Sequence, residues 1–186
     1  MGKSVLALVA ILVLYIGCRD EASTAGYMAD DMMSSTGAEN LDIPYQKFCQ
    51  GYEALDAALV ANTYTKDAVL INVYNGSLPI SFQGRNSIDS FFVATFARAL
   101  ESNVGLQINF KLTSRQERKG QVLDNGLYKL SVSSPGQAVD HRYGKFSIVL
   151  QQEQGSWKFA IDTNASATEE EYRQVVGGLI GSDGRR

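Results

Sequence analysis

The first pattern in the chain is a repeat of hydrophobic residues every three or four positions, which is typical of one face of a helix. The residues that carry it between positions 45 and 59 are Tyr45, Phe48, Cys49, Tyr52, Leu55 and Leu59. Pro44 suits a first helical turn, and Asp42 is a residue type that caps helix starts. A second amphipathic helix is predicted to open at Gly84-Arg85-Asn86 and to carry Ile88, Phe91, Phe92, Thr95, Phe96 and Leu100.

Hydrophobic and polar residues alternate through most of the chain after residue 105, as they do in half-buried strands. Turn residues at Asn75-Gly76, Ser133–Gly136 and Gln154–Ser156 separate the alternating segments. The pattern predicts strands over residues 67–74, 79–82, 106–113, 120–132, 141–151 and 157–163. An interruption is expected inside the fourth of these strands, at Asp124-Asn125-Gly126.

The order of the predicted elements gives the fold class. Thr168 and Glu171 form a capping-box pattern, which predicts a last helix over Glu169–Ile180 whose end is weakened by Gly177-Gly178. Helices followed by a run of strands, without alternating βαβ units, are typical of an α+β fold with a mainly antiparallel sheet.

The N-terminal segment has the composition of an export signal. A basic start at Lys3 is followed by an apolar run, Ser4–Ile16, which is shorter than the roughly 20 residues of a membrane-spanning helix. Gly17-Cys18 after this run resembles a bacterial lipobox, which implies a lipid-anchored lipoprotein in the periplasm or at the cell surface. Tyr15 departs from that motif, because a leucine is usual there. Cleavage near Ala22–Ala25, with Cys18 incidental, and an uncleaved anchor are the alternatives.

These patterns divide the chain into four parts. Residues 1–17 are expected to be the signal peptide, 18–42 a flexible acidic tether, 43–166 the folded domain, and 167–186 a C-terminal helix and tail. Removal of the signal peptide would leave a domain that is less apolar than the whole chain.

Composition narrows the function classes without naming one. The 186 residues are 45% hydrophobic and carry a net charge of −3, which excludes a disordered chain and argues against a nucleic-acid-binding surface. Two cysteines and one histidine provide no metal site, and no cofactor motif is present in the sequence, so neither a metal nor a cofactor is expected. Cys49 lies on the apolar helix stripe and is expected to be a buried thiol.

Four short segments, in order, resemble the NTF2-like superfamily, and in particular its DUF4440/SnoaL-like branch. They are residues 56–68 (DAALVANTYTKDA), 82–88 (FQGRNSI), 144–146 (GKF) and 155–162 (GSWKFAID). The resemblance covers about residues 44 to 166. It implies a cystatin-like cone, in which a curved, mainly antiparallel sheet packs against N-terminal helices and encloses an apolar cavity.

The resemblance also tests one known mechanism of the fold. Ketosteroid isomerase, a member of this superfamily, has a carboxylate base late on the first strand, and the matching position here is Asn72. An amide cannot accept a proton near neutral pH, so the isomerase mechanism does not transfer. Whether the chain is an enzyme is left open.

Other residues are candidates for chemistry or binding. Asp162 and His141 are the candidate acid/base residues, with Arg142 or Tyr143 as other partners of Asp162. Strict alternation groups Asp162 with Lys158 and Ala160, which would point it outward as a solvated charge. The candidate ligand-binding residues, which can equally be ordinary core or surface residues, are Tyr52, Asn72, Tyr74, Phe92, Phe96, Tyr128, Tyr143 and Trp157.

Three functions therefore compete. The first is an exported, lipid-anchored domain that binds a small apolar or amphipathic ligand, or a protein partner, without catalysis. The second is an isomerase, cyclase or hydrolase that uses Asp162 or His141. The third is an interaction module that forms a homodimer through its sheet.

Overall fold

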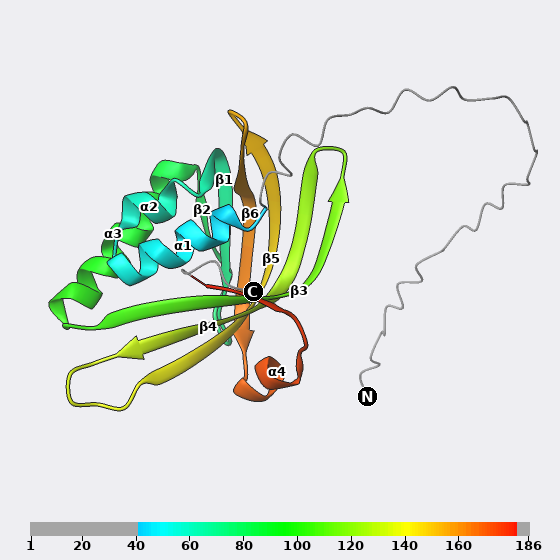
Figure 1. Cartoon of the computed structure of the whole chain (residues 1–186). Helices are drawn as coiled ribbons and strands as arrows, with labels where there is room; N and C mark the ends of the chain where they lie inside the picture. The colour runs from blue at the N-terminus through cyan, green and yellow to red at the C-terminus, as the bar shows by residue number, and fades with distance from the viewer. Residues whose placement is uncertain (1–40, 182–186) are drawn as a thin grey trace, which may run out of the picture. The chain divides into compact units, whose positions relative to one another are not determined.

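A seven-stranded mixed sheet curves around the helices in the order β2-β1-β6-β5-β4-β3-β7 (Figure 1). The structure is a computed structural model, and it describes residues 41–181. β1 and β6 pair in parallel, and the other neighbouring strands are antiparallel. The strands are β1 (Tyr64–Val73), β2 (Ile80–Gln83), β3 (Gly105–Arg118), β4 (Gln121–Ser133), β5 (Asp140–Glu153), β6 (Ser156–Ala167) and β7 (Gly178–Ile180). The predicted α+β class with a mainly antiparallel sheet is confirmed.

Three helices cover one face of the sheet, and they differ in part from the prediction. They are α1 (Ile43–Ala54), α2 (Ala57–Ala61) and α3 (Arg85–Glu101). The single helix predicted through Leu59 is wrong, because Leu55 adopts a left-handed conformation (φ 53°) that ends α1. The Asp56 side chain then accepts a hydrogen bond from the Leu59 amide and caps α2.

The core lies between these helices and the inner face of the sheet. Aromatic rings dominate it, and most of their contacts are edge-on or tilted, as preferred for such pairs. The largest buried side chains of the core include Tyr45, Tyr64, Phe92, Phe96, Phe159, Leu70, Ile88, Ile148 and Leu150. Each such side chain removed from water stabilises the fold by about 1.5–3 kcal/mol.

The interruption predicted in β4 does not occur. Asp124, Asn125 and Gly126 lie within a continuous strand that pairs with both β3 and β5. A Cβ atom on Gly126 would lie 2.2 Å from the backbone oxygen of Lys111, so glycine is required there by close packing and not by a turn. The ladder accommodates the segment with one extra residue on β3, Thr113.

A bulge in β6 decides which of its side chains face the core. Val149 on β5 pairs with Ile161, and Leu150 pairs with Phe159, so Ala160 is an extra residue in β6. The extra residue shifts the alternation by one position. Phe159 and Asp162 therefore share the inner face, whereas Ile161 is 43% exposed on the outer face.

The C-terminal segment differs from the predicted helix over Glu169–Ile180. The capping box forms as predicted and starts α4 (Glu169–Gln174), but the helix stops before Gly177. Gly178–Ile180 then forms β7 on the edge of the sheet beside β3. Gly177 explains this close pairing, since a Cβ atom there would lie 2.2 Å from the backbone oxygen of Leu112.

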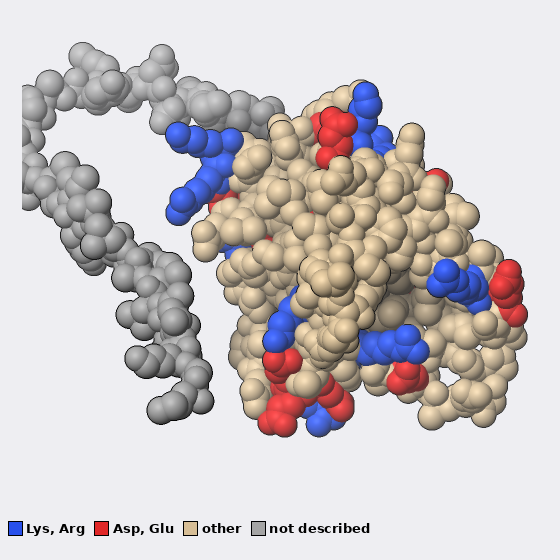
Figure 2. Space-filling view, turned by 180° about the vertical axis from the view of Figure 1, so that it is seen from behind, with Lys and Arg blue, Asp and Glu red and all other residues tan. Residues whose placement is uncertain are grey.

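The charged surface carries no patch of a single sign on the face drawn in Figure 2. Lys and Arg lie beside Asp and Glu in small mixed groups, and the middle of this face is uncharged. This distribution gives no broad electropositive track for a nucleic-acid backbone. Of the helices in residues 41–181, none is long and apolar enough to cross a membrane.

Candidate functional site

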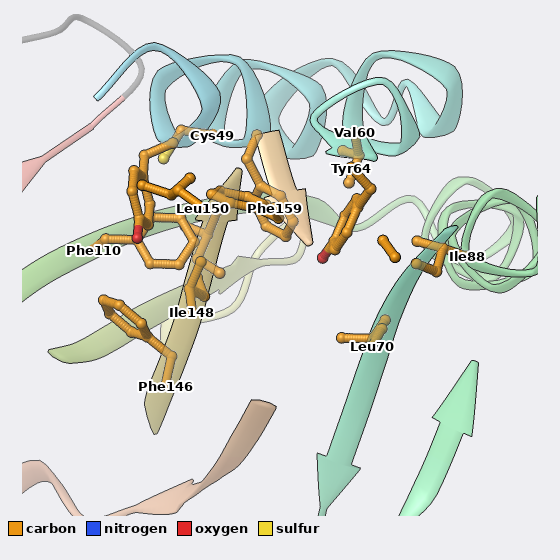
Figure 3. Close-up of a cluster of buried hydrophobic side chains, with 14 of the residues drawn as sticks. Cys49, Val60, Tyr64, Leu70, Ile88, Phe110, Phe146, Ile148, Leu150 and Phe159 are labelled. Atoms are coloured by element: carbon orange, nitrogen blue, oxygen red, sulfur yellow. The ribbon is translucent and has the colours of Figure 1, made fainter. Parts of the chain in front are cut away.

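A buried carboxyl group on the inner face of the sheet is the centre of the candidate site. Asp162 is 3% exposed and accepts a hydrogen bond from the Tyr64 hydroxyl at 2.6 Å and another from the Asn164 amide at 3.0 Å. Tyr64 reaches this position from the start of β1, where its side chain extends inward between Phe159 and Leu70 (Figure 3). The Ala160 bulge is what turns Asp162 inward, against the outward position that strict alternation gives.

Further polar side chains surround this carboxyl group. Asn164 also donates its amide to the Asn72 side-chain oxygen at 3.4 Å, and Asn72 is only 6% exposed. Besides burial, the charge of Asp162 raises the pKa of Tyr52 on α1 and of Tyr128 on β4, so both side chains lie near this carboxyl group. We call these six residues, Asp162, Tyr64, Asn72, Asn164, Tyr52 and Tyr128, the Asp162 cluster.

Burial governs the protonation of the cluster. It raises the pKa of Asp162 to about 6, although the hydrogen bonds from Tyr64 and Asn164 favour the charged form and lower it. Burial, followed by the charge of Asp162, holds the pKa of Tyr64 well above its usual value. Burial also raises the pKa of Tyr128 to about 12, so both hydroxyls keep their protons near neutral pH. They can therefore donate hydrogen bonds.

Several polar atoms of the cluster are open to solvent. Within residues 41–181, every side-chain nitrogen or oxygen that is shut off from solvent has a hydrogen-bond partner. In the same range, the hydroxyls of Tyr52 and Tyr128 make no hydrogen bond, and the Asn72 amide nitrogen donates none. These atoms therefore keep some contact with solvent and have unused hydrogen-bonding capacity.

Glycine positions one member of the cluster. The Tyr128 ring lies against Gly144 on the neighbouring strand, and a Cβ atom there would be 2.1 Å from the ring. Any larger residue at position 144 would displace Tyr128. Ring packing positions a second member, Tyr52. Its ring centroid lies 5.1, 6.0 and 5.2 Å from those of Phe48, Phe92 and Phe96.

The remaining candidate ligand-binding residues lie elsewhere. Phe92 and Phe96 are each 2% exposed and belong to the packed core. Tyr74 is 48% exposed beyond the end of β1. Trp157 packs against the core at the opposite end of β6 from the cluster. Tyr143 lies under α4, where its hydroxyl donates to Glu169 at 3.3 Å.

His141 and Asp162 are not brought together. Ile148 is the β5 residue opposite Asp162, and His141 lies seven positions before it, which is roughly 23 Å along a strand at about 3.3 Å per residue. His141 is exposed, and its Nδ1 atom lies 3.1 Å from the Ser131 hydroxyl. Arg142 pairs with exposed Asp140, as expected of a surface ion pair.

Sequence reasoning missed Tyr64 as a site residue. It precedes the predicted strand and lies within a segment that resembles the NTF2-like superfamily. The residue type itself could have indicated this role. A core position between α2 and β1 would accept phenylalanine equally well, so the hydroxyl of a tyrosine there indicates a polar partner. The role of Gly144 was missed because it depends on the β4–β5 register, which places it opposite Tyr128.

A second buried polar network is fully paired and is structural. Asp124 accepts from the Tyr45 hydroxyl at 2.8 Å and from two nitrogens of Arg115, each at 2.8 Å. Arg115 also pairs with Asp42 at 3.0 Å, so the network joins the start of α1 to β3 and β4. Cys49 is buried in the core, as predicted, and burial raises the pKa of its thiol to about 12, which makes it a poor nucleophile.

Two surface hollows lie near α4 and contain no residue of the Asp162 cluster. One, of about 390 Å³, lies between α4 and the outer face of β3–β5, where Lys145 and Glu171 pair with each other. The other, of about 600 Å³, is lined by residues 168–174. In residues 41–181 no three histidine, cysteine or acidic side chains gather as a metal-ligand set.

Comparison with known proteins gives the class of fold. No family model and no curated protein matches the chain. Among solved structures, Aln2 from a Streptomyces species has a TM-score of 0.57 at 16% identity, covering 66% of this chain and 84% of Aln2. An NTF2-like protein with a cystatin-like fold from Novosphingobium aromaticivorans gives 0.54 at 10% identity, covering 69% and 80%.

A ketosteroid isomerase-like protein from Erwinia carotovora atroseptica is also similar. Its TM-score is 0.51 at 14% identity, and the match covers 69% of this chain and 94% of that protein. The chain therefore has the NTF2-like, cystatin-type fold predicted from its sequence. At these identities the similarity defines the fold and leaves the activity to be argued from the site.

Proposed function

We propose that this domain binds a small, mainly apolar molecule through a polar group held at the Asp162 cluster. One observation carries the proposal. Polar atoms that keep contact with solvent lie around a buried carboxyl group, and this group lies beside an aromatic core. Sites for small molecules typically combine apolar walls with a few placed polar groups. The unpaired hydroxyls of Tyr52 and Tyr128 and the amide of Asn72 supply such groups here.

The test is ligand-induced stabilisation of the folded domain. We expect at least one member of a panel of small aromatic and alicyclic alcohols, ketones and amines to raise the melting temperature. At a concentration of 100 Kd, the expected stabilisation is about 2.7 kcal/mol, or several degrees for a domain of this size.

Matched tyrosine variants assign the site. Tyr128→Phe removes a hydroxyl of the cluster, whereas Tyr172→Phe makes the same change on α4. We expect Tyr128→Phe to reduce the shift and Tyr172→Phe to retain it. If no probe shifts the melting temperature, or if Tyr128→Phe responds as the wild type does, the proposal fails.

A second candidate function is acid/base catalysis at Asp162. A carboxyl group whose pKa is about 6 can both give and accept a proton near neutral pH. This favours an isomerase, cyclase or hydrolase that uses Asp162 over one that uses exposed His141. Asn72 occupies the position that the family resemblance assigns to the base of ketosteroid isomerase. We therefore place any catalytic carboxylate on β6 and not on β1.

A homodimer through the outer sheet face is the proposed partner interaction. Leu123, Val149 and Ile161 lie side by side on three strands there, and Leu123 and Ile161 are 36% and 43% exposed. Apolar residues in adjacent positions suit burial against a second copy. Sedimentation of the wild type and of Val149→Lys tests this. A monomeric wild type at high concentration would contradict it.

Export and lipid attachment at Cys18 are proposed from the sequence alone. Cys18, like the rest of residues 1–40, lies outside the described part of the structure. A tether over residues 18–42 would then connect the anchor to a domain that begins at α1.

A further inference from the structure

The Asp162 carboxyl group differs from the other buried acids in its lack of a cationic partner. Asp42 and Asp124 both pair with Arg115. Among the ion pairs formed within residues 41–181, none includes Asp162. A buried carboxylate without a counter-charge is costly, and proteins usually pair such groups.

The hydrogen-bond partners and the strand neighbours of Asp162 are neutral. Its neighbours in the register are Leu70 on β1 and Ile148 on β5. Within residues 41–181, the one titratable group that shifts its pKa is the Tyr64 hydroxyl, and the charge of Asp162 in turn raises the pKa of Tyr45 and Tyr52 on α1, Tyr64 on β1 and Tyr128 on β4. Its remaining hydrogen-bond partner, Asn164, is an amide. The protein thus surrounds one acid with aromatic rings and neutral dipoles.

We propose that the ligand of the Asp162 cluster is an organic cation, an amine or ammonium group attached to an apolar body. This inference rests on the proposed function and names the ligand class for the same site. The ammonium group would pair with the Asp162 carboxylate. The hydroxyl oxygens of Tyr52 and Tyr128, which make no hydrogen bond within residues 41–181, would accept hydrogen bonds from it. Asn72, which is 6% exposed, retains an acceptor oxygen beside this position.

The same arrangement disfavours an anionic ligand. A carboxylate or phosphate group would meet the charge of Asp162, with no lysine, arginine or histidine to offset it in the cluster. A neutral alcohol could bind the tyrosine hydroxyls, but it would leave the carboxylate without a counter-charge. An amine is therefore the ligand whose charge the site complements.

Isosteric probes test the inference. Benzylamine, benzyl alcohol and benzoate have similar bodies and differ in charge, and calorimetry or a fluorescence titration gives their affinities. At pH 7.5 we expect benzylamine to bind about tenfold or more tighter than benzyl alcohol. Benzoate should bind most weakly. Asp162→Asn should bring the amine and the alcohol to similar affinity, and Asp67→Asn, at an exposed position of β1, should leave the preference unchanged.

The outcomes separate this inference from the proposed function. If benzyl alcohol binds and benzylamine binds no tighter, the cation inference is overturned and the binding site stands. If benzoate binds best, or if Asp162→Asn retains the amine preference, the inference is also overturned. If none of the three probes binds, the proposed function itself fails for this ligand size, and with it the inference.

A second measurement uses only the wild-type protein, so it does not depend on whether a variant folds. The carboxyl group is partly protonated near pH 6, so amine binding to the wild type should release a proton there. Calorimetry at pH 5.5 in two buffers of different ionisation enthalpy counts the released protons. We expect most of one proton per benzylamine and none per benzyl alcohol. Equal proton release for both probes, or none for the amine, would contradict the inference.

Discussion

Asp162 combines deep burial with the absence of a cationic partner among the described residues, and its ionisation therefore acts against the fold. The folded protein holds a proton between about pH 4 and pH 6 that the unfolded chain has already lost, because burial raises the pKa from 3.8 to about 6. The contribution of this group to the free energy of unfolding therefore falls as the pH rises through that window.

Asp162→Asn removes this pH dependence. The free energy of unfolding of the variant, relative to the wild type, should increase by up to about 3 kcal/mol between pH 4 and pH 7.5. Urea unfolding at the two pH values measures the difference. Asp67→Asn, at an exposed position, serves as the control and should show little change. A wild type and an Asp162→Asn variant with the same pH dependence would show that Asp162 is not desolvated as described.

Sequence identified Asp162 as a candidate but did not settle its direction. The inward position depends on Ala160, whose role as the extra residue of a bulge has no signal in a single sequence. A bulge is decided by the pairing of β6 with β5, and periodicity within β6 alone predicts the opposite face. Tyr52, Asn72 and Tyr128 were predicted as binding residues, and the structure places them together around Asp162.

At the scale of the elements, local turn chemistry competes with long-range packing. Asp124-Asn125-Gly126 has a turn composition, yet β3 and β5 pair with it from both sides and keep it extended. Conversely, Leu55 ends α1 although nothing in its type predicts a left-handed conformation. The capping box at Thr168 was predicted correctly because all of its interactions are local.

Substitutions of two adjacent glycines in the C-terminal segment test the close packing of β7 against β3. Gly177→Ala would place a Cβ atom against the backbone of Leu112, whereas a Cβ atom on Gly178 would meet no atom within 4 Å. We expect Gly177→Ala to lower the free energy of unfolding by about 1–3 kcal/mol, as overpacking does. Gly178→Ala should stay near the wild-type value.

Urea unfolding and hydrogen exchange report these effects. The amides of β7 and of the β3 residues that pair with it should exchange faster in Gly177→Ala. Equal behaviour of the two variants would mean that β7 does not approach β3 as closely as the structure indicates.

At the scale of the whole molecule, the order of helices and strands was sufficient to predict the fold class. The α+β class follows from helix and strand periodicity, and the NTF2-like architecture was implied by the resemblance of four short segments to that superfamily. The partners of each side chain did not follow, since register and bulges are set by contacts between distant segments. The predicted export of the domain depends on residues outside the described range, and it is tested separately.

Cys18→Ser tests the proposed anchor in the full-length chain expressed in a bacterial host. The wild type should fractionate with membranes and carry a lipid on Cys18, and the variant should lose both properties. Cys49→Ala, at the buried thiol, should remain anchored. Mass spectrometry of the mature protein identifies its N-terminus. A wild type without lipid that begins between residues 22 and 26 would favour ordinary signal-peptide cleavage instead.

The most direct test of the central claim is to locate a bound small molecule by NMR. A ¹⁵N-labelled domain titrated with benzylamine should show saturable shifts of the side-chain amide signals of Asn72 and Asn164, which belong to the Asp162 cluster. Signals from α4 and the outer sheet face should stay in place. Shifts confined to α4 or the outer face, with the two asparagine signals unchanged, would contradict the assignment of the site to the Asp162 cluster.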